Sequence, residues 1–186
     1  MTFGYGLLGL IAAAVGYLIY IYNALVSNKN MVSEGWSGID VQLKRRADLI
    51  PNLIETVKGY ASHEDKLFRD IADLRAKSIA GGSVGEQSAI GQAMSGALGK
   101  LFAVAEAYPE LKADANFRDL QQQLSGIEDE IQLSRRYYNG TVRNLNTMIE
   151  SFPSNIVANY FKFLKSEFFD IGNAAQREVP KVDFKK

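Results

Sequence analysis

The first apolar segment of the chain is uninterrupted. Residues 3–22, FGYGLLGLIAAAVGYLIYIY, carry no charged side chain. A helix of this length is about 30 Å long, which matches the hydrocarbon thickness of a bilayer. Tyr5 near one end and Tyr17, Tyr20 and Tyr22 near the other resemble the aromatic belts of membrane spans. The pattern predicts an N-terminal transmembrane anchor, assigned to residues 1–24.

Small residues mark one side of this predicted span. They recur at spacings of three and four, which lets transmembrane backbones approach closely. This pattern predicts an association face made of Gly9, Ala12, Ala13 and Gly16. A cleaved signal peptide is the alternative for the whole segment. However, no basic region precedes it, and the alanines at 12–14 lead into more apolar sequence instead of a polar mature start.

Charges beside the span bear on its orientation. Met1 and Thr2 carry no side-chain charge, whereas Lys29 and then Lys44, Arg45 and Arg46 follow the apolar segment. The positive-inside rule therefore predicts a short N-terminus outside and a cytoplasmic C-terminal domain. An extracytoplasmic domain is the alternative, because only Lys29 lies close to the span.

Beyond the span, apolar residues recur at steps of three and four along most of the chain. This spacing predicts one long helix from about residue 31 to Leu74, ended by the glycine-rich residues 80–85, and a second helix over residues 86–107. A turn is expected over 108–117. The seam from Phe117 to Ile149 is heptad-like, as in a coiled coil. A short aromatic helix, capped by Ser154, is expected to extend to Phe169.

These elements predict an all-α fold. An N-terminal transmembrane helix is followed by an antiparallel up-and-down four-helix bundle with a long, kinked first helix. The bundle domain is assigned to residues 25–170 and an extended tail to residues 171–186. Residues 23–32 contain neither Gly nor Pro, so the span is expected to continue straight into the bundle. A hinge at residues 27–30 is the alternative.

A proline interrupts the apolar pattern of the first long helix, in the stretch IDVQLKRRADLIPNLIETVKGY. Pro51 has no backbone N–H and clashes with the carbonyl of Ala47, at a cost of about 3 kcal/mol unless packing compensates. The apolar steps resume at Ile54 on the far side. The pattern therefore predicts a kink at Pro51 and Asn52, and not the end of the helix.

Positive and negative side chains lie just before this proline. Side chains of both signs also occur on the predicted third helix. If the two helices run antiparallel, Arg46 would face Glu128 or Glu130, and Asp40 would face Arg136. Such pairing would fix the register of the helices more than it would add stability. Ordinary solvation of a charged surface is the alternative. The predicted structural polar lock comprises Asp40, Lys44, Arg45, Arg46, Asp48, Glu128, Glu130, Arg135 and Arg136.

Composition argues against several kinds of site. Lys plus Arg and Asp plus Glu both total 21, so no net charge attracts nucleic acid. The chain has no cysteine, which excludes disulfides and thiol nucleophiles. The single His63 cannot supply the histidine pairs of a di-metal bundle, and Lys100 lacks the flanking residues of a phosphate loop. We therefore predict no catalytic residue, cofactor or metal site, and the sequence points to no known small-molecule ligand.

Several long motifs resemble the LemA family. They are YNALVSNKNMVSEGWSGIDVQLKRRADLIPNLIETVKGYASHE, LFAVAEAYPELKADANFRDLQQQLSGIEDEIQLSRRYYNGTVRNLN and FPSNIVANYF. The resemblance covers the chain from Tyr22 to the VPKVDF tail. It implies a bacterial inner-membrane protein with one N-terminal span, a short N-terminus outside and a helical-bundle domain, but no activity. The matching signature positions are Tyr22, Asn23, Asp40, Arg45, Arg46, Asp48, Pro51, Asn52, Leu53, Tyr108, Pro109, Arg135, Tyr138 and Asn139.

The sequence thus favours a non-enzymatic, membrane-anchored scaffold or interaction protein. Its expected partners are the lipid bilayer and either further copies of itself or another membrane protein. One alternative is a ligand-binding receptor or enzyme with a polar site between bundle helices. Another is an oligomeric protein that remodels membranes.

Overall fold

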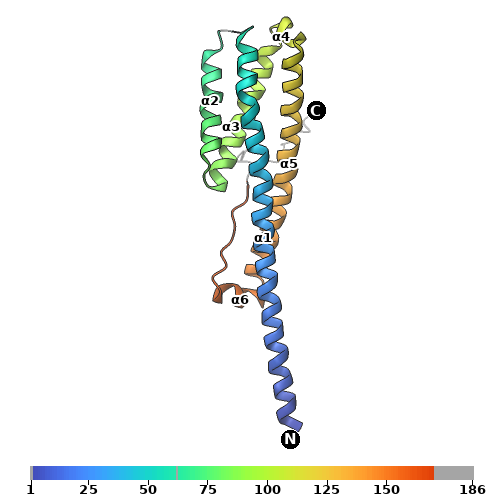
Figure 1. Ribbon diagram of the computed structural model, residues 1–186. Coiled ribbons are helices and arrows are strands. Elements are labelled where there is room, and N and C mark those ends of the chain that lie inside the picture. The colour runs from blue at the N-terminus through green and yellow to red at the C-terminus, as the bar shows by residue number, and fades with distance from the viewer. Residues whose placement is uncertain (1, 62, 170–186) are drawn as a thin grey trace, which may run out of the picture. The chain divides into compact units, whose positions relative to one another are not determined.

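The computed structural model describes residues 2–61 and 63–169, with side chains from Tyr5 onward (Figure 1). Every regular element of this described part is a helix, which confirms the predicted all-α class. The helices are α1 (Thr2–Lys58), α2 (Asp65–Ala80), α3 (Val84–Ala105), α4 (Pro109–Ala113), α5 (Ala115–Glu150) and α6 (Ser154–Tyr160).

The described chain forms two compact units. Of the described residues, the first unit comprises residues 2–46 and 122–168, and the second comprises residues 47–61 and 63–121 together with Phe169. The boundaries fall inside α1 and α5. The predicted domains 1–24, 25–170 and 171–186 rest on membrane anchoring as well as on packing, and they stay a prediction. The predicted tail lies outside the described residues.

Helix α1 is continuous from the apolar segment to Lys58. The alternative hinge at residues 27–30 is therefore wrong, and the predicted straight continuation is confirmed. Side chains 5–20 are all exposed, and burial begins at Ile21 and Leu25. By length and composition, α1 is the one described helix that could cross a membrane.

The predicted helix from residue 31 to Leu74 is wrong in its length, because the chain turns back after Lys58. The amides of Tyr60 and Ala61 both donate to the carbonyl of Val57, at 3.0 and 2.9 Å, and this closes the last turn of α1. The reversal buries Ala61 and, at the start of α2, Phe68.

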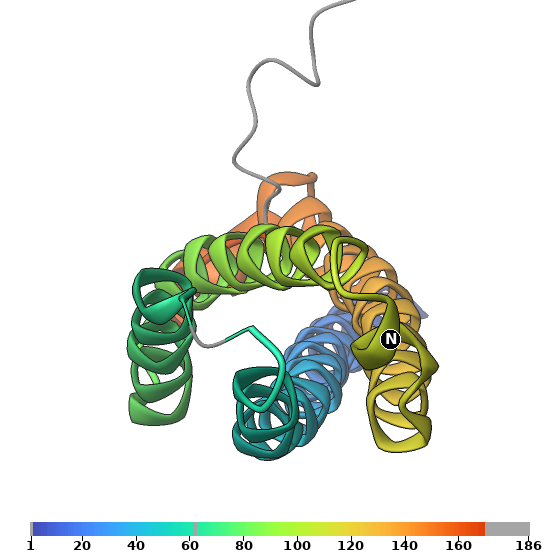
Figure 2. The ribbon, with the colours of Figure 1, turned by 90° about the horizontal axis from the view of Figure 1, so that it is seen from above.

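Two glycines make the connection from α2 to α3, as expected from the sequence. Gly81 and Gly82 have φ values of 78° and 148°, a region that other residues rarely adopt. Ser83 then starts α3 with a capping box, because its hydroxyl accepts the amide of Glu86 while the Glu86 carboxylate accepts the amide of Ser83. Helix α3 lies alongside α2 and leads to α4 (Figure 2). The short α4 occupies the region predicted as a turn, with Pro109 in its first turn.

Helix α5 confirms the predicted seam, and within the first unit it pairs with α1. Asn28 donates to the sulfur of Met148 at 3.2 Å. The ring of Trp36 meets that of Tyr138 edge-on, with centroids 5.8 Å apart. Because rising numbers in α1 pair with falling numbers in α5, the two helices run in opposite directions in this unit. The seam's buried side chains are Phe117, Leu120, Leu124, Ile127, Ile131, Tyr138, Val142, Leu145 and Ile149.

The aromatic helix predicted to reach Phe169 is wrong in its length, because α6 ends at Tyr160. Lys162 adopts a left-handed φ of 57°. The amides of Phe163 and Lys162 bond back to the carbonyls of Ala158 and Asn159, at 2.9 and 3.2 Å, which is a Schellman motif. The predicted cap Ser154 acts elsewhere, since its hydroxyl donates to the carbonyls of Met148, in the last turn of α5, and Ser151, just beyond it.

Replacing Lys162 by Gly is expected to raise the free energy of unfolding by about 0.5–1 kcal/mol, because Gly enters the left-handed region without a Cβ penalty. Lys162→Ala is the matched control, since it removes the same side chain but keeps the Cβ. Urea unfolding of the full chain in detergent micelles, followed by circular dichroism, measures both. Equal stability of the two variants would contradict a left-handed residue 162.

Candidate functional site around Pro51

Pro51 lies inside α1, and a side chain from α2 replaces the hydrogen bond that it removes. Without an N–H at residue 51, the carbonyl of Ala47 lacks its helical donor. Arg75 supplies the donor, with its Nε 2.7 Å from that carbonyl oxygen. Ala47 is only 2% exposed, so water offers little replacement. This bond explains why α1 continues past Pro51, as predicted, while the predicted kink at Pro51 and Asn52 stays a prediction.

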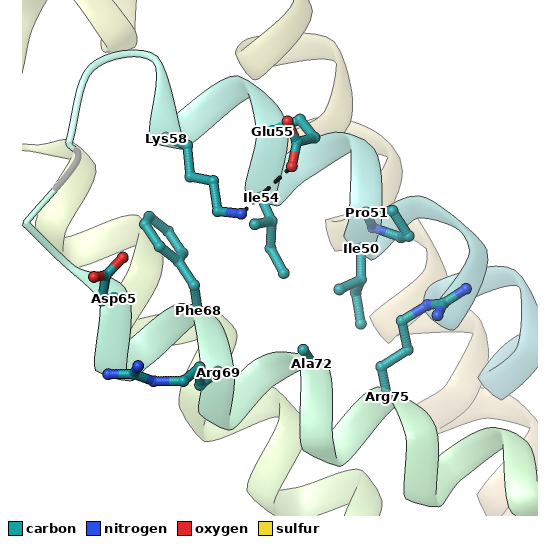
Figure 3. A pocket seen from close by; sticks show the side chains of 10 residues that line it. All are labelled: Ile50, Pro51, Ile54, Glu55, Lys58, Asp65, Phe68, Arg69, Ala72 and Arg75. Carbon is teal, nitrogen blue, oxygen red and sulfur yellow. Dashed lines mark hydrogen bonds and ion pairs between the residues drawn. The ribbon is translucent and has the colours of Figure 1, made fainter.

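A pocket of about 430 Å³ lies between this part of α1 and α2 (Figure 3). Ile50, Ile54 and Phe68 form its apolar wall. Lys58 reaches across it, with its Nζ 3.5 Å from a carboxylate oxygen of Glu55 and 5.9 Å from the centre of the Phe68 ring. The charged groups at the rim are of both signs. The pocket therefore has no strong preference for an anion or a cation.

The predicted pairing of Arg46 with Glu128 is present in the first unit. Arg46 Nη1 lies 3.0 Å from Glu128 Oε2, and the two side chains are 3% and 34% exposed. Gln132 donates to the other carboxylate oxygen at 3.4 Å. Burial lowers the pKa of Arg46 from its ordinary value, and the charge and hydrogen bond of Glu128 offset part of that lowering. Arg46 is a buried cation whose charge is balanced by a partly hydrated anion.

The other members of the predicted polar lock lie at the surface. Arg45 donates to Gln42 of its own helix at 3.2 Å. Among the described residues, no ion pair joins Asp40 to Arg136. The register-setting role of the lock as a whole stays a prediction. Arg135 is half-buried, and the exposed members are Asp40, Lys44, Arg45, Asp48, Glu130 and Arg136.

The predicted transmembrane association face is open in the single chain. Apart from the neighbouring backbone of α1 itself, no atom of the described structure lies within 4 Å of a Cβ built on Gly9 or Gly16, and Ala12 and Ala13 are exposed. Within residues 2–61 and 63–169, no group of three or more His, Asp or Glu could hold a metal ion. The expected absence of metal, cofactor and catalytic residues stays a prediction.

Two residues with structural roles, one in each unit, were not singled out for these roles from the sequence. The sequence contained one indirect indication of the role of Arg75. A proline inside a helix implies a carbonyl that needs a donor, but it does not show which residue supplies that donor. Tyr138 is buried, and its hydroxyl donates to the carbonyl of Glu167 at 2.8 Å. Burial, and next the charge of Glu167, raise the pKa of Tyr138. Tyr138 thus fixes the returning segment after α6.

Comparison with known proteins shows the family of this chain. The chain is 25% identical to the magnetosome protein MamQ 1 of Paramagnetospirillum magneticum and to the magnetosome protein MamQ of Magnetospirillum gryphiswaldense, over 86% of this chain and 68% of each relative. It is 26% identical to the protein LemA of Metamycoplasma hominis, over 94% of this chain and 78% of that protein. A family model described as the LemA family matches residues 35–184. The chain therefore belongs to the LemA family.

Proposed function

We propose that this protein is a non-enzymatic, membrane-anchored scaffold that assembles with copies of itself or with another membrane protein. The observation that carries the proposal is the course of α1. Its exposed apolar part, residues 5–20, runs without a break into the part that packs against α5. Such a helix couples a membrane span rigidly to a folded unit, which suits a protein that positions partners at a bilayer.

The proposed location is the bacterial inner membrane, with a single span. The short N-terminus lies outside and the helical domain lies in the cytoplasm, in keeping with Lys29 and the cations that follow it. Two relatives are named magnetosome proteins, which supports a membrane-associated role for this chain.

We also propose that the helices assemble as an antiparallel up-and-down four-helix bundle. The opposite courses of α1 and α5 in the first unit support this arrangement. In the second unit, α2 folds back beside the end of α1, since Arg75 contacts Ala47 whereas Phe68 lies by Lys58. The pair of α1 and α2 has the geometry that a short connection imposes on neighbouring helices.

Self-association is tested by single cysteines in the span, because the chain has none of its own. Ala12→Cys and Ala13→Cys place a thiol on the small-residue face, and Ala14→Cys places one on the opposite side of the same helix. We expect mild oxidation of native membranes to link the first two variants into disulfide dimers and to leave the third monomeric. Non-reducing electrophoresis provides the measurement.

The Ala14→Cys variant controls for chance collisions in the membrane. Equal dimer yields at all three positions would show that the small-residue face does not direct assembly. If none of the variants forms dimers, and amine cross-linking of the unmodified protein also traps no second protein, the scaffold proposal fails.

A further inference from the structure

An unusual number of large apolar side chains are exposed just after α5. In residues 152–164, here called the aromatic hook, Phe152 is 80% exposed, Tyr160 79% and Leu164 82%. Ile156 and Phe161 are also exposed. Exposed apolar side chains gathered in this way mark a surface that contacts a membrane or another protein.

The hook packs against α1, and the two elements enclose an apolar groove of about 440 Å³. The ring of Tyr22 lies 4.7 Å from that of Phe161 and 6.0 Å from that of Phe163, measured between centroids. Leu18 and Ile19 of α1 face Ile156 and Tyr160 across the groove. The groove is lined almost entirely by apolar atoms. It therefore suits a hydrocarbon chain and offers almost no polar partner.

The contacts with Tyr22 fix where the hook lies along α1. Side chains 5–20 of α1 are exposed, and burial begins at Ile21. The groove therefore lies at the C-terminal end of the proposed span, where the hydrocarbon of a bilayer gives way to headgroups. The apolar lining of the groove is continuous with the exposed apolar surface of α1. Lipid that surrounds this part of α1 should therefore also cover the groove.

Charges and hydrogen bonds in and after the hook fit this position. Lys162 is exposed between Phe161 and Phe163, an alternation of aromatic and cationic side chains suited to a headgroup layer. The chain that returns from the hook is held by Asn146, which exchanges hydrogen bonds with the backbone of Ser166 at 3.0 and 2.9 Å. The hook is thus a fixed projection of the first unit.

We propose that the aromatic hook inserts into the bilayer interface beside α1, and that the groove between them holds an acyl chain of a phospholipid. This inference rests on the membrane anchor of the proposed function and adds a second membrane contact to it. The hook would set the depth and tilt of α1, because interfacial aromatic side chains resist movement toward either water or hydrocarbon.

Three matched Leu→Cys variants of the full chain test the proposal: Leu164 in the hook, Leu133 on the exposed side of α5 and Leu18 in the proposed span. Each carries a nitroxide label and is placed in phospholipid nanodiscs. Electron paramagnetic resonance then measures collisions with molecular oxygen, which concentrates in lipid, and with a water-soluble nickel chelate. At Leu164 we expect an oxygen-to-nickel collision ratio several-fold above that at Leu133 and near that at Leu18.

The other outcomes are distinct. A label at Leu164 that collides with nickel as often as the label at Leu133 would overturn the proposal, because the hook would then lie in water. Low collision rates with both reagents would also overturn it, because a protein surface would cover the hook. A water-like ratio at Leu18 would instead refute the anchor of the proposed function. Phe152→Cys repeats the test in the same hook should the Leu164 variant misfold.

Discussion

Replacing Arg75 by Met is expected to lower the free energy of unfolding by about 1–3 kcal/mol, the usual cost of leaving a buried polar group without its partner. Met keeps much of the aliphatic length of the arginine but cannot donate a hydrogen bond. The carbonyl of Ala47, which now accepts from Nε at 2.7 Å, would then have no donor, because Pro51 has no N–H to offer.

The same substitution should cost less when residue 51 can donate. In a Pro51→Ala background, the amide of residue 51 can bond to the carbonyl of Ala47, as in an ordinary helix. We therefore expect Arg75→Met to cost less than about 1 kcal/mol there, which gives a coupling energy of about 1–2 kcal/mol. Pro51→Ala alone should gain less than the roughly 3 kcal/mol cost of an uncompensated helix-interior proline, since Arg75 already compensates in part.

Urea unfolding of the full chain in detergent micelles, followed by circular dichroism, measures all four members of this cycle. Arg69→Met is the control, because Arg69 lines the same pocket from α2 but is exposed. It should change the stability by no more than about 0.5 kcal/mol. Equal losses from Arg75→Met in the wild-type and Pro51→Ala backgrounds would show that the arginine acts through packing and not through the orphaned carbonyl.

Local periodicity predicted most of the helices because their buried faces are formed by residues close in sequence. The seam from Phe117 to Ile149 became α5, and residues 86–107 became α3 with small changes at the ends. The error at residues 59–64 has a physical cause. Apolar steps on either side of a turn keep the same spacing when both helices bury their faces in one core, so the pattern of Val57, Ala61 and Phe68 does not reveal the reversal.

The candidate site was predictable only where complementary charges pointed to a partner. Arg46 and Glu128 have opposite charges and lie on long helices whose antiparallel pairing aligns them, so the sequence suggested their contact. The bond from Arg75 to Ala47 joins a side chain to a backbone carbonyl across the unpredicted turn. Every residue has a backbone carbonyl, so the sequence does not reveal which carbonyl a side chain will bond. In addition, Arg75 comes near Ala47 only because α2 folds back along α1.

Glu128→Gln is expected to destabilise the protein much more than Arg46→Met. The Arg46 side chain is 3% exposed, whereas that of Glu128 is 34% exposed. Without the carboxylate charge, a buried guanidinium loses its counter-ion and cannot recover hydration. Losses of about 3–5 kcal/mol are typical for fully buried pairs, and the partial exposure of Glu128 reduces our expectation to about 2–3 kcal/mol.

Arg46→Met removes the buried cation and leaves the partly exposed carboxylate of Glu128. The remaining carboxylate can be hydrated through its exposed third, and Met fills much of the volume of the arginine stem, so we expect a loss of about 1 kcal/mol or less. In the Arg46→Met background, Glu128→Gln should cost little, because no buried cation remains. Glu130→Gln is the matched control, since Glu130 is an exposed carboxylate on the same helix, and should stay within about 0.5 kcal/mol of wild type.

The order of these losses decides what Arg46 does in the fold. If the buried charge of Arg46 is what makes the Glu128 carboxylate necessary, stability depends on Glu128 only while Arg46 is present. Unfolding of the wild type, the two single variants and the double variant in detergent micelles will then show strong coupling between the two positions. If the two single substitutions cost the same and their effects add, Arg46 must find hydration or other acceptors when Glu128 is neutral. The pair would then contribute no more than a surface ion pair, and the central part of the predicted lock would not constrain α1 against α5.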